Sequence, residues 1–410
     1  MSIHLRFRCQ QALMWGSFGL ILPVLTLLLV HAGFSLFEIG LFAALFSLST
    51  VMLELPFGAL ADRLGRLRAY RWSLLTNGAG CGIMLLCDQK PLLFLAAACF
   101  GMARAMNSGT VDAWYVQLLR DSGISERIPY HLGFAELSAA LGMALFSLIG
   151  GFLPDLLGRH LFANPYKAGF GLSGLLFLLL LWLTPRLFPE SERIGGGPAS
   201  VKLTGHLRQL ILFAWGELNI RQLLLRFMLL GGVISILESY WPVVLKNILP
   251  ATGSTWVFGL FLTLMLVVKG VGGWLSFIVL RIFSARPAAA VAFSLSGLAG
   301  GLFMTARVHE AAHLGIFLVL TALFLGIAGG VINALLHQHA PDHFRSTALS
   351  FFSVAFQLGS VLSSLLLGYL IGIAGVQAVW AGVSVLVALT ALYGLWPVRV
   401  AAACGNPAKR

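Results

Sequence analysis

A stretch of 53 residues, 346–398, contains no Asp, Glu, Lys, Arg or His, and this feature limits the fold more than any other. A helix needs about 20 apolar residues to cross a bilayer, so the stretch accommodates two crossings with a tight turn near residues 372–375. The whole chain agrees, because 59% of its residues are hydrophobic, 10% are charged and its mean hydropathy is +0.91. Strands of a membrane barrel would alternate in polarity. These runs are continuous, so the sequence predicts an all-α membrane protein.

Counting such runs along the chain predicts twelve transmembrane helices. Their expected ranges are residues 12–30, 36–57, 70–87, 92–115, 131–153, 168–188, 223–245, 255–280, 287–306, 312–335, 346–371 and 376–397. Of the 27 Lys and Arg residues, 19 fall in segments that this topology places inside and 5 in outer segments. The positive-inside rule therefore predicts a multi-pass protein of the plasma membrane, here a bacterial inner membrane, with both termini in the cytoplasm.

The formal net charge of +12 does not indicate a nucleic acid partner, because the basic residues are dispersed along the chain and alternate between loops. The five cysteines have no spacing typical of a metal site or a disulfide framework. A phosphate-binding Gly-x-x-x-x-Gly-Lys-Ser/Thr loop is absent from the sequence. We therefore expect no metal and no cofactor, and a monomer whose partners are the lipid bilayer, a small-molecule substrate and protons.

The fifth and eleventh expected spans are related by an internal repeat. A shift of 217 residues aligns residues 141–142 and 151–153 with 358–359 and 368–370. Repeated halves are the architecture by which secondary transporters alternate access to a site near the bilayer midplane. The sequence thus predicts two pseudo-symmetric six-helix bundles, at residues 1–188 and 222–410. A cytoplasmic linker with an amphipathic helix, at residues 189–221, is expected to join them.

The loop after the second span reads GALADRLGRLR, at residues 58–68. Two glycines permit a tight backbone turn, an Asp suits a helix N-terminus, and an Arg can fork onto a carboxylate. The segment resembles the signature loop of the major facilitator superfamily, Gly-x-x-x-Asp-Arg/Lys-x-Gly-Arg/Lys, which joins transmembrane helices 2 and 3 in the cytoplasm. The resemblance implies the major facilitator fold, a transporter rather than an enzyme, and a cytoplasmic gate. The matching gate positions are Gly58, Asp62, Arg63, Gly65 and Arg66, with Asp112 as the span 4 acid that pairs with the second basic residue.

Arg104 is expected near the middle of the fourth span, where a charge is costly unless it is paired or hydrated. Counting the helical rise places Glu136 at nearly the same depth, which predicts an ion pair that is either a titratable switch or a permanent structural contact. The segment RAMNSGT is similar to the Arg-x-x-Gln-Gly motif of the superfamily, with Asn107 in place of Gln and Gly109 one residue late. That resemblance implies proton coupling. The expected proton-coupling residues are Arg104, Glu136, Glu238 and Asp112.

The second half contributes Glu238, in SILESYWPVV, and Lys269, in VVKGVGG. A carboxylate beside the aromatic faces of Tyr240 and Trp241 suits an organic cation, although both aromatics would equally suit the outer aromatic belt of a membrane protein. The expected substrate-binding residues are Trp15, Arg104, Asn107, Glu238, Tyr240, Trp241, Lys269, Asn333, His337 and Gln357.

The leading functional hypothesis is proton-coupled export of a small amphiphilic organic molecule by alternating access, because the expected cavity is apolar and aromatic with few charges. Gly142, Gly150 and Gly151 resemble the glycine-rich antiporter motif of exporters, with Phe146 and Ser147 replacing its central Gly-Pro.

Two alternatives remain open. A proton-coupled importer of an organic anion, such as a siderophore, would use Arg104 and Lys269 as carboxylate clamps. An intramembrane metal-dependent enzyme would instead use His337, His339, His343 and Asp342, since histidines and an acid at this spacing can bind zinc.

Overall fold

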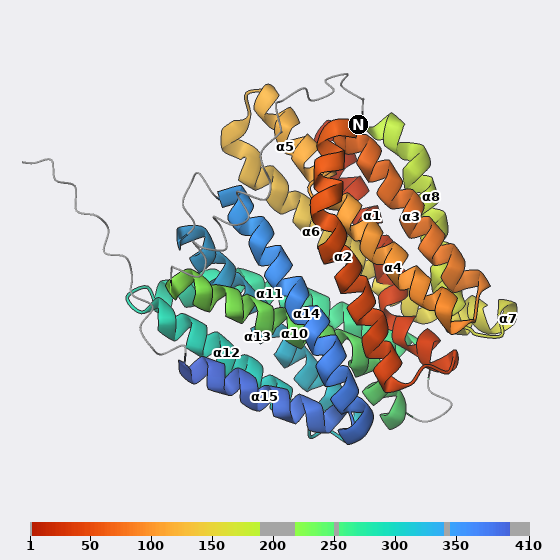
Figure 1. Cartoon of the computed structure of the whole chain (residues 1–410), viewed down its shortest axis with the longest axis vertical. Helices are drawn as coiled ribbons and strands as arrows, with labels where there is room; N and C mark the ends of the chain where they lie inside the picture. Colours follow the sequence, from red (N-terminus) through yellow and green to blue (C-terminus); the bar gives the residue numbers. More distant parts are fainter. Residues whose placement is uncertain (1, 189–217, 250–253, 340–344, 394–410) are drawn as a thin grey trace, which may run out of the picture.

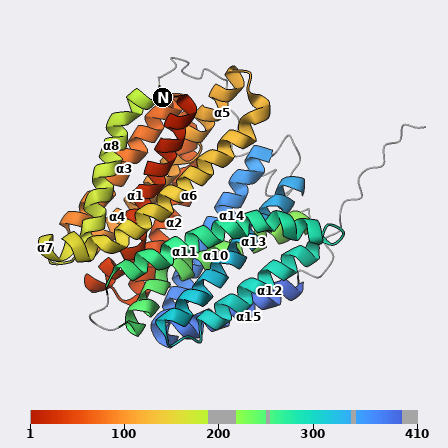
Figure 2. The same cartoon turned by 180° about the vertical axis from the view of Figure 1, so that it is seen from behind.

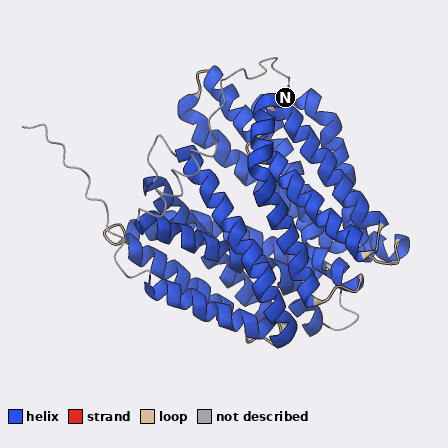
Figure 3. Ribbon diagram, viewed as in Figure 1, coloured by secondary structure: helices blue, strands red, loops and turns tan. Residues whose placement is uncertain are grey.

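The structure, a computed structural model, describes residues 2–188, 218–249, 254–339 and 345–393. Over these residues the chain is built of helices and contains no strand (Figure 3). The helices of the first half are α1 (Ile3–His31), α2 (Leu36–Leu64), α3 (Arg66–Leu86), α4 (Lys90–Asn107), α5 (Val111–Asp121), η1 (Ser125–Arg127), α6 (Ile128–Leu153), η2 (Pro154–Gly158), α7 (Arg159–Leu161) and α8 (Lys167–Leu187). Those of the second half are α10 (Leu218–Ile248), α11 (Trp256–Ile282), α12 (Pro287–Thr305), α13 (Ala311–His339), α14 (Arg345–Ala374) and α15 (Val376–Tyr393).

Each expected span overlaps one of these helices, and ten segments in the described part are long and apolar enough to cross a membrane. The helix α15 is apolar but shorter, and α3 carries several arginines in its first turns, so neither belongs to the ten. Both nevertheless pack lengthwise against spanning helices, α15 against α12 and α3 against α4 and α8. The all-helical membrane fold is thus confirmed, and twelve crossings are consistent with it.

The helices form two bundles (Figures 1 and 2). In the first, α1 packs against α6 and α8, and α4 packs against α2 and α3; in the second, α10 packs against α14 and α13, and α12 packs against α13 and α15. The bundles meet mainly through α2 against α14 and α6 against α11.

Glycines related by the sequence repeat occupy equivalent places in the two bundles. A Cβ on Gly142 would strike the backbone of α1 at Ala12, and one on Gly359 would strike the backbone of α10 at Met228. Gly151 of α6 faces Gly259 of α11, and Gly368 of α14 faces Gly40 of α2. Close helix approach at small residues is how membrane helices gain packing energy. The pseudo-symmetry expected from the repeat is therefore present in the fold.

The expected loop at residues 58–68 is much shorter in the structure. The helix α2 continues to Leu64, so Gly58 lies inside a helix and does not form the turn. Gly65 alone makes the turn, with φ +95°, as the cap between α2 and α3. Asp62 belongs to the last turn of α2, and its side chain lies outside the part of the structure that is described.

The fourth expected span is broken in two. Residues 108–110 separate α4 from α5, with Gly109 at φ +66°. The expected amphipathic linker helix falls largely on residues 189–217, which lie outside the described residues, and its last four positions belong to α10.

The two ends of the molecule differ in how closely the bundles approach. We call the end that carries the start of α1 and the Gly65 turn the N-terminal face, and the opposite end, with residues 32–35 and 306–310, the far face. Inter-bundle hydrogen bonds near the far face include Tyr240 Oη to Leu36 O, 2.8 Å, and Thr255 Oγ1 to Gly151 O, 2.6 Å. Toward the N-terminal face the bundles diverge (Figures 1 and 2). We call the contacts that join the two bundles near the far face the far-face seal; they are formed between α2 and α14, between α2 and α10, between α1 and α10 and between α6 and α11.

Candidate functional site

A cavity of about 460 Å³ lies between the two bundles, beneath the far-face seal. Its wall is formed chiefly by α1, α2 and α4 of the first bundle and by α10, α11 and α14 of the second. Most of the wall is apolar and aromatic, with side chains including Trp15, Phe18, Phe42, Phe46, Phe100 and Phe356. Ligand pockets typically combine such a surface with a few fixed polar groups.

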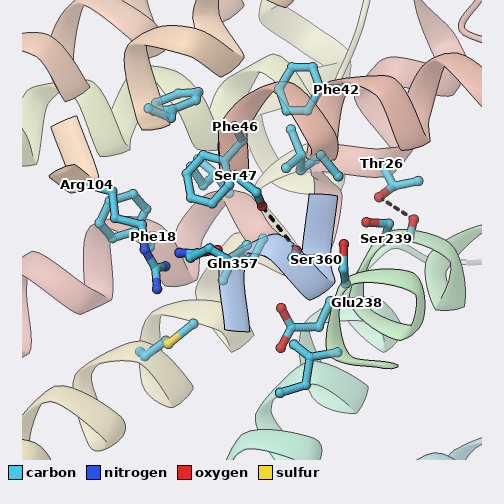
Figure 4. A pocket seen from close by; sticks show the side chains of 18 of the residues that line it. Phe18, Thr26, Phe42, Phe46, Ser47, Arg104, Glu238, Ser239, Gln357 and Ser360 are labelled. Atoms are coloured by element: carbon cyan, nitrogen blue, oxygen red, sulfur yellow. Dashed lines mark hydrogen bonds between the residues drawn. The ribbon is translucent and has the colours of Figure 1, made fainter. Parts of the chain in front are cut away.

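Small hydroxyl side chains join the two bundles where the cavity meets the seal. The hydroxyls of Ser47 and Ser360 are 3.1 Å apart across the two bundles, and Thr26 Oγ1 donates to Ser239 O at 2.9 Å (Figure 4). Because these bonds join α2 to α14 and α1 to α10, a movement that opens the far face must break them.

Three charged side chains line the cavity. Arg104 of α4 is exposed to it, with Cζ 5.8 Å from the centroid of the Phe46 ring, and it forms no ion pair with any described residue. Lys269 Nζ lies 3.8 Å from Glu238 Oε1, and the two side chains are 36% and 48% exposed. Figure 4 shows Arg104 and Gln357 extending from opposite bundles into the same space. The cavity therefore presents an unpaired guanidinium and a loose ion pair.

Six of the ten expected substrate-binding residues are in the wall: Trp15, Arg104, Asn107, Glu238, Lys269 and Gln357. Four are not. Tyr240 and Trp241 are each 1% exposed, and they neither line the cavity nor face lipid. Tyr240 belongs to the far-face seal, and Trp241 packs on Phe258 and Phe261. Asn333 and His337 lie on α13, which packs against α10, α11 and α12 and contributes nothing to the wall of this cavity.

The expected pair of Arg104 and Glu136 is not formed. Both residues are described, and no ion pair joins them. The helical rise gave the two residues nearly the same depth, but their helices are not neighbours. The helix α6 packs against α1 and α11, whereas α4 packs against α2 and α3. Glu136 is exposed and lies within electrostatic range of Asp112 instead.

Asp112 also has a different partner from the expected one. Its Oδ1 accepts a hydrogen bond from Gln11 Nε2 of α1, at 2.5 Å, and it makes no ion pair with Arg66. The break before α5 starts a new helix at Val111, which places Asp112 in the first turn of α5. A gate that includes Asp62 stays a prediction, because that side chain is not described.

Sequence reasoning missed an amide and a carboxylate of this region, and also the hydroxyl residues of the seal. Asn77 of α3 lines the cavity, although it is fully buried. Glu54 of α2 accepts a hydrogen bond from Ser108 Oγ at 3.1 Å and lies within electrostatic range of Arg104. The sequence did contain a signal for Asn77, because it is an amide within a largely apolar run. The hydroxyl residues of the seal could not be recognised in this way, since Ser and Thr are common throughout such helices.

The histidines proposed as metal ligands do not form a site in the described residues, where no group of three or more His, Cys, Asp and Glu side chains could hold an ion. Asp342 and His343 lie outside the described residues, as does the side chain of His339.

Comparison with known proteins agrees with this architecture. The sequence profile of the Major Facilitator Superfamily matches residues 9–308. The uncharacterized MFS-type transporter YxaM of Bacillus subtilis (strain 168) is 20% identical over 399 residues, covering 94% of this chain and 92% of that protein. The inner membrane transport protein YajR of Escherichia coli (strain K12) is 29% identical over 148 residues, which is 36% of this chain and 31% of that protein.

Two solved structures share the fold. The nucleoside transporter NupG has a TM-score of 0.76 at 16% identity, covering 96% of this chain and 98% of that one. A bacterial homologue of the human lysosomal transporter Spinster, in an inward-facing and unoccupied conformation, has a TM-score of 0.77 at 14% identity, covering 96% and 95%. The profile match spans well over half of the chain, so this protein is a member of the major facilitator superfamily and a multi-pass membrane transporter, not an enzyme.

Proposed function

We propose that this chain is a proton-coupled secondary transporter that exports a small amphiphilic organic molecule by alternating access. The single observation that carries the proposal is the cavity of about 460 Å³ between the bundles, whose wall is mainly aromatic and aliphatic but holds Arg104, Glu238 and Lys269. An amphiphile would place its apolar body on the rings and its polar group on one of these charges.

The bundles of residues 1–188 and 222–410 are the units that rock against each other in this proposal. The N-terminal face is cytoplasmic, in keeping with the excess of basic residues in the loops assigned to that side. The structure then corresponds to the inward-open state of a monomer, with its far-face seal closed toward the outside.

Proton coupling is assigned to Glu238. Its separation of 3.8 Å from Lys269 is longer than a strong charge-assisted hydrogen bond, and both side chains are accessible from the cavity. Protonation of Glu238 would remove the attraction and free Lys269, so the charge distribution of the cavity would change with each proton bound. Moving one charge through 100 mV supplies about 2.3 kcal/mol, which is enough to drive a cargo against a moderate gradient.

The experiment uses proteoliposomes with a trapped pH-sensitive dye and an imposed pH gradient, to which amphiphilic amines, neutral amides and carboxylates are added in turn. We expect at least one class to accelerate proton movement in wild type and not in Glu238→Gln. The matched control is Glu310→Gln, because Glu310 lies in a far-face loop, outside the cavity wall, and its ion-pair partner is His313. Cargo-dependent proton movement that is unchanged in Glu238→Gln would contradict the assignment.

A second candidate is proton-coupled uptake of an organic anion, which the unpaired Arg104 favours. In that case only the carboxylates among the added molecules would accelerate proton movement, and Arg104→Gln would abolish this acceleration. The direction of coupled flux under a fixed gradient separates the two candidates.

A further inference from the structure

The burial of Asn77 of α3 lowers the stability of the fold. Its side chain is 0% exposed, and within the described part of the chain neither its amide nitrogen nor its amide oxygen has a hydrogen-bond partner. A buried donor or acceptor that is left unpaired loses its bonds to water and gains nothing in return. Such groups are rare in folded proteins, and each one calls for a physical explanation.

The position of Asn77 links it to Arg104. Three residues beyond Asn77, a Cβ on Gly80 would lie 2.9 Å from the Phe100 ring, and one residue before Asn77, Thr76 Oγ1 lies 3.8 Å from Met106 Sδ. Asn77 thus lies on α3 between the levels of Phe100 and Met106 of α4, which is the level of Arg104. Asn77, Arg104 and Asn107 all line the cavity, and they are its polar residues from α3 and α4.

The neighbouring serine and threonine hydroxyls of α3 do not donate to the Asn77 amide. Ser73 Oγ donates to Tyr70 O at 2.7 Å, and Thr76 Oγ1 donates to Trp72 O at 2.9 Å. The cavity is the other source of a partner. A cargo group held by Arg104 would arrive at the correct level to bond the amide.

We propose that Asn77 is a cargo-binding residue, which forms with Arg104 and Asn107 a subsite for the anionic head group, such as a carboxylate, of an amphiphile. The guanidinium supplies the positive charge and parallel N–H donors, and the two amides add N–H donors beside it. Because the Asn77 amide atoms are not exposed in this conformation, they are reached only when side chains of the wall shift, so binding is an induced fit. The assignment rests on the proposed function, because it assumes that an amphiphilic cargo occupies the cavity.

The test is equilibrium binding to the purified full-length protein in detergent without any gradient, with three probes that share one apolar body: naphthylacetate, naphthylacetamide and naphthylethylamine. We expect naphthylacetate to bind wild type more tightly than the amine. Asn77→Leu should weaken naphthylacetate by roughly tenfold, as expected for losing a hydrogen bond to a charged group. It should leave the melting temperature of the empty protein unchanged or raised, because an unpaired polar group has been removed.

The matched control is Thr76→Val, which removes a hydroxyl at the adjacent position. This hydroxyl bonds to Trp72 O and Met106 Sδ, and Thr76 does not belong to the described cavity wall. The substitution should leave naphthylacetate binding unchanged. Asn77→Ser keeps a shorter polar group, fits the site with less crowding than Leu, and should give a partial loss of affinity.

Two results would overturn the assignment. One is naphthylacetate binding to wild type that is no tighter than binding of naphthylethylamine. The other is a lowered melting temperature in both Asn77 variants with unchanged naphthylacetate affinity, which would make Asn77 a structural residue. Because no gradient is present, either result leaves proton-coupled export of a cation standing, and a failure of proton coupling in proteoliposomes leaves the subsite standing.

Discussion

Gly259→Ala should shift the protein away from the conformation described here. A Cβ at this position of α11 would lie 2.5 Å from the carbonyl oxygen of Ser147 and 3.0 Å from Cα of Gly151, both on α6 of the other bundle. Neither atom can rotate away, because both are backbone. The added methyl group must therefore push the bundles apart at the far-face seal or strain them in place.

The size of the effect follows from the cost of overpacking, about 1–3 kcal/mol for a methyl group forced into a filled contact. If the open-seal conformation relieves this cost, its population relative to the closed-seal conformation rises about 5- to 150-fold. Gly270→Ala is the control, since it lies on the same helix and a Cβ there meets nothing within 4 Å. Both substitutions gain the same intrinsic helix propensity, about 1 kcal/mol, so that gain cancels in the comparison.

The assay is the distance between spin labels at Ala163 and Glu310, which are exposed loop residues of the two bundles on the far face. The five native cysteines are first replaced. We expect Gly259→Ala to populate a longer distance and Gly270→Ala to match the unsubstituted protein. A distribution that Gly259→Ala leaves unchanged, with only a lower melting temperature, would show that α6 and α11 form a fixed core, and the reasoning would fail.

Four further predictions concern other contacts and turns of the fold. Asp155→Asn should lengthen the same label distance more weakly than Gly259→Ala, because Asp155 Oδ2 accepts a hydrogen bond from Thr255 N across the bundles at 2.6 Å; an unchanged distance would exclude Asp155 from the seal. Gly65→Ala should destabilise the fold by about 1–2 kcal/mol in thermal unfolding, because φ +95° is unfavourable for a residue with a Cβ. Gly58→Ala should leave stability equal or higher, since this helical glycine has open space around it, and a loss comparable to that of Gly65→Ala would restore Gly58 to the turn. Adding Lys269→Gln to Glu238→Gln should cause no further loss of proton movement, so that the double variant behaves as either single one. Additive losses would indicate that the two residues act independently.

Hydropathy predicted the helices well, because the length of an apolar run is fixed by the bilayer and needs no knowledge of packing. Arg104, Glu238 and Lys269 could be found in the same way, since a charge within such a run is costly and tends to face a cavity. All three do line it.

The depth of a residue along its helix gives neither the position of the helix in the bundle nor the direction in which the side chain points. The remaining errors come from these two quantities. Glu136 matched Arg104 in depth but lies on a helix that packs elsewhere. Tyr240 and Trp241 neighbour Glu238 in sequence, yet the rotation of α10 turns them into packed interior while Glu238 faces the cavity. Asn77 was not among the expected site residues, because its contribution to the wall depends on the way α3 packs against α4.

Alternating access around this cavity can be measured without knowing the cargo, by the labelling of a cysteine at position 107, Asn107→Cys, with a membrane-impermeant thiol reagent added to either face, scored on the peptide that carries this residue. The comparison is between proteins with and without a disulfide that locks the seal, built as Ser47→Cys with Ser360→Cys, whose hydroxyls are 3.1 Å apart. We predict reaction from both faces when the disulfide is reduced and from the N-terminal face alone when it is oxidised. Reaction from the far face that persists in the oxidised protein, or that never occurs in the reduced one, would contradict the account.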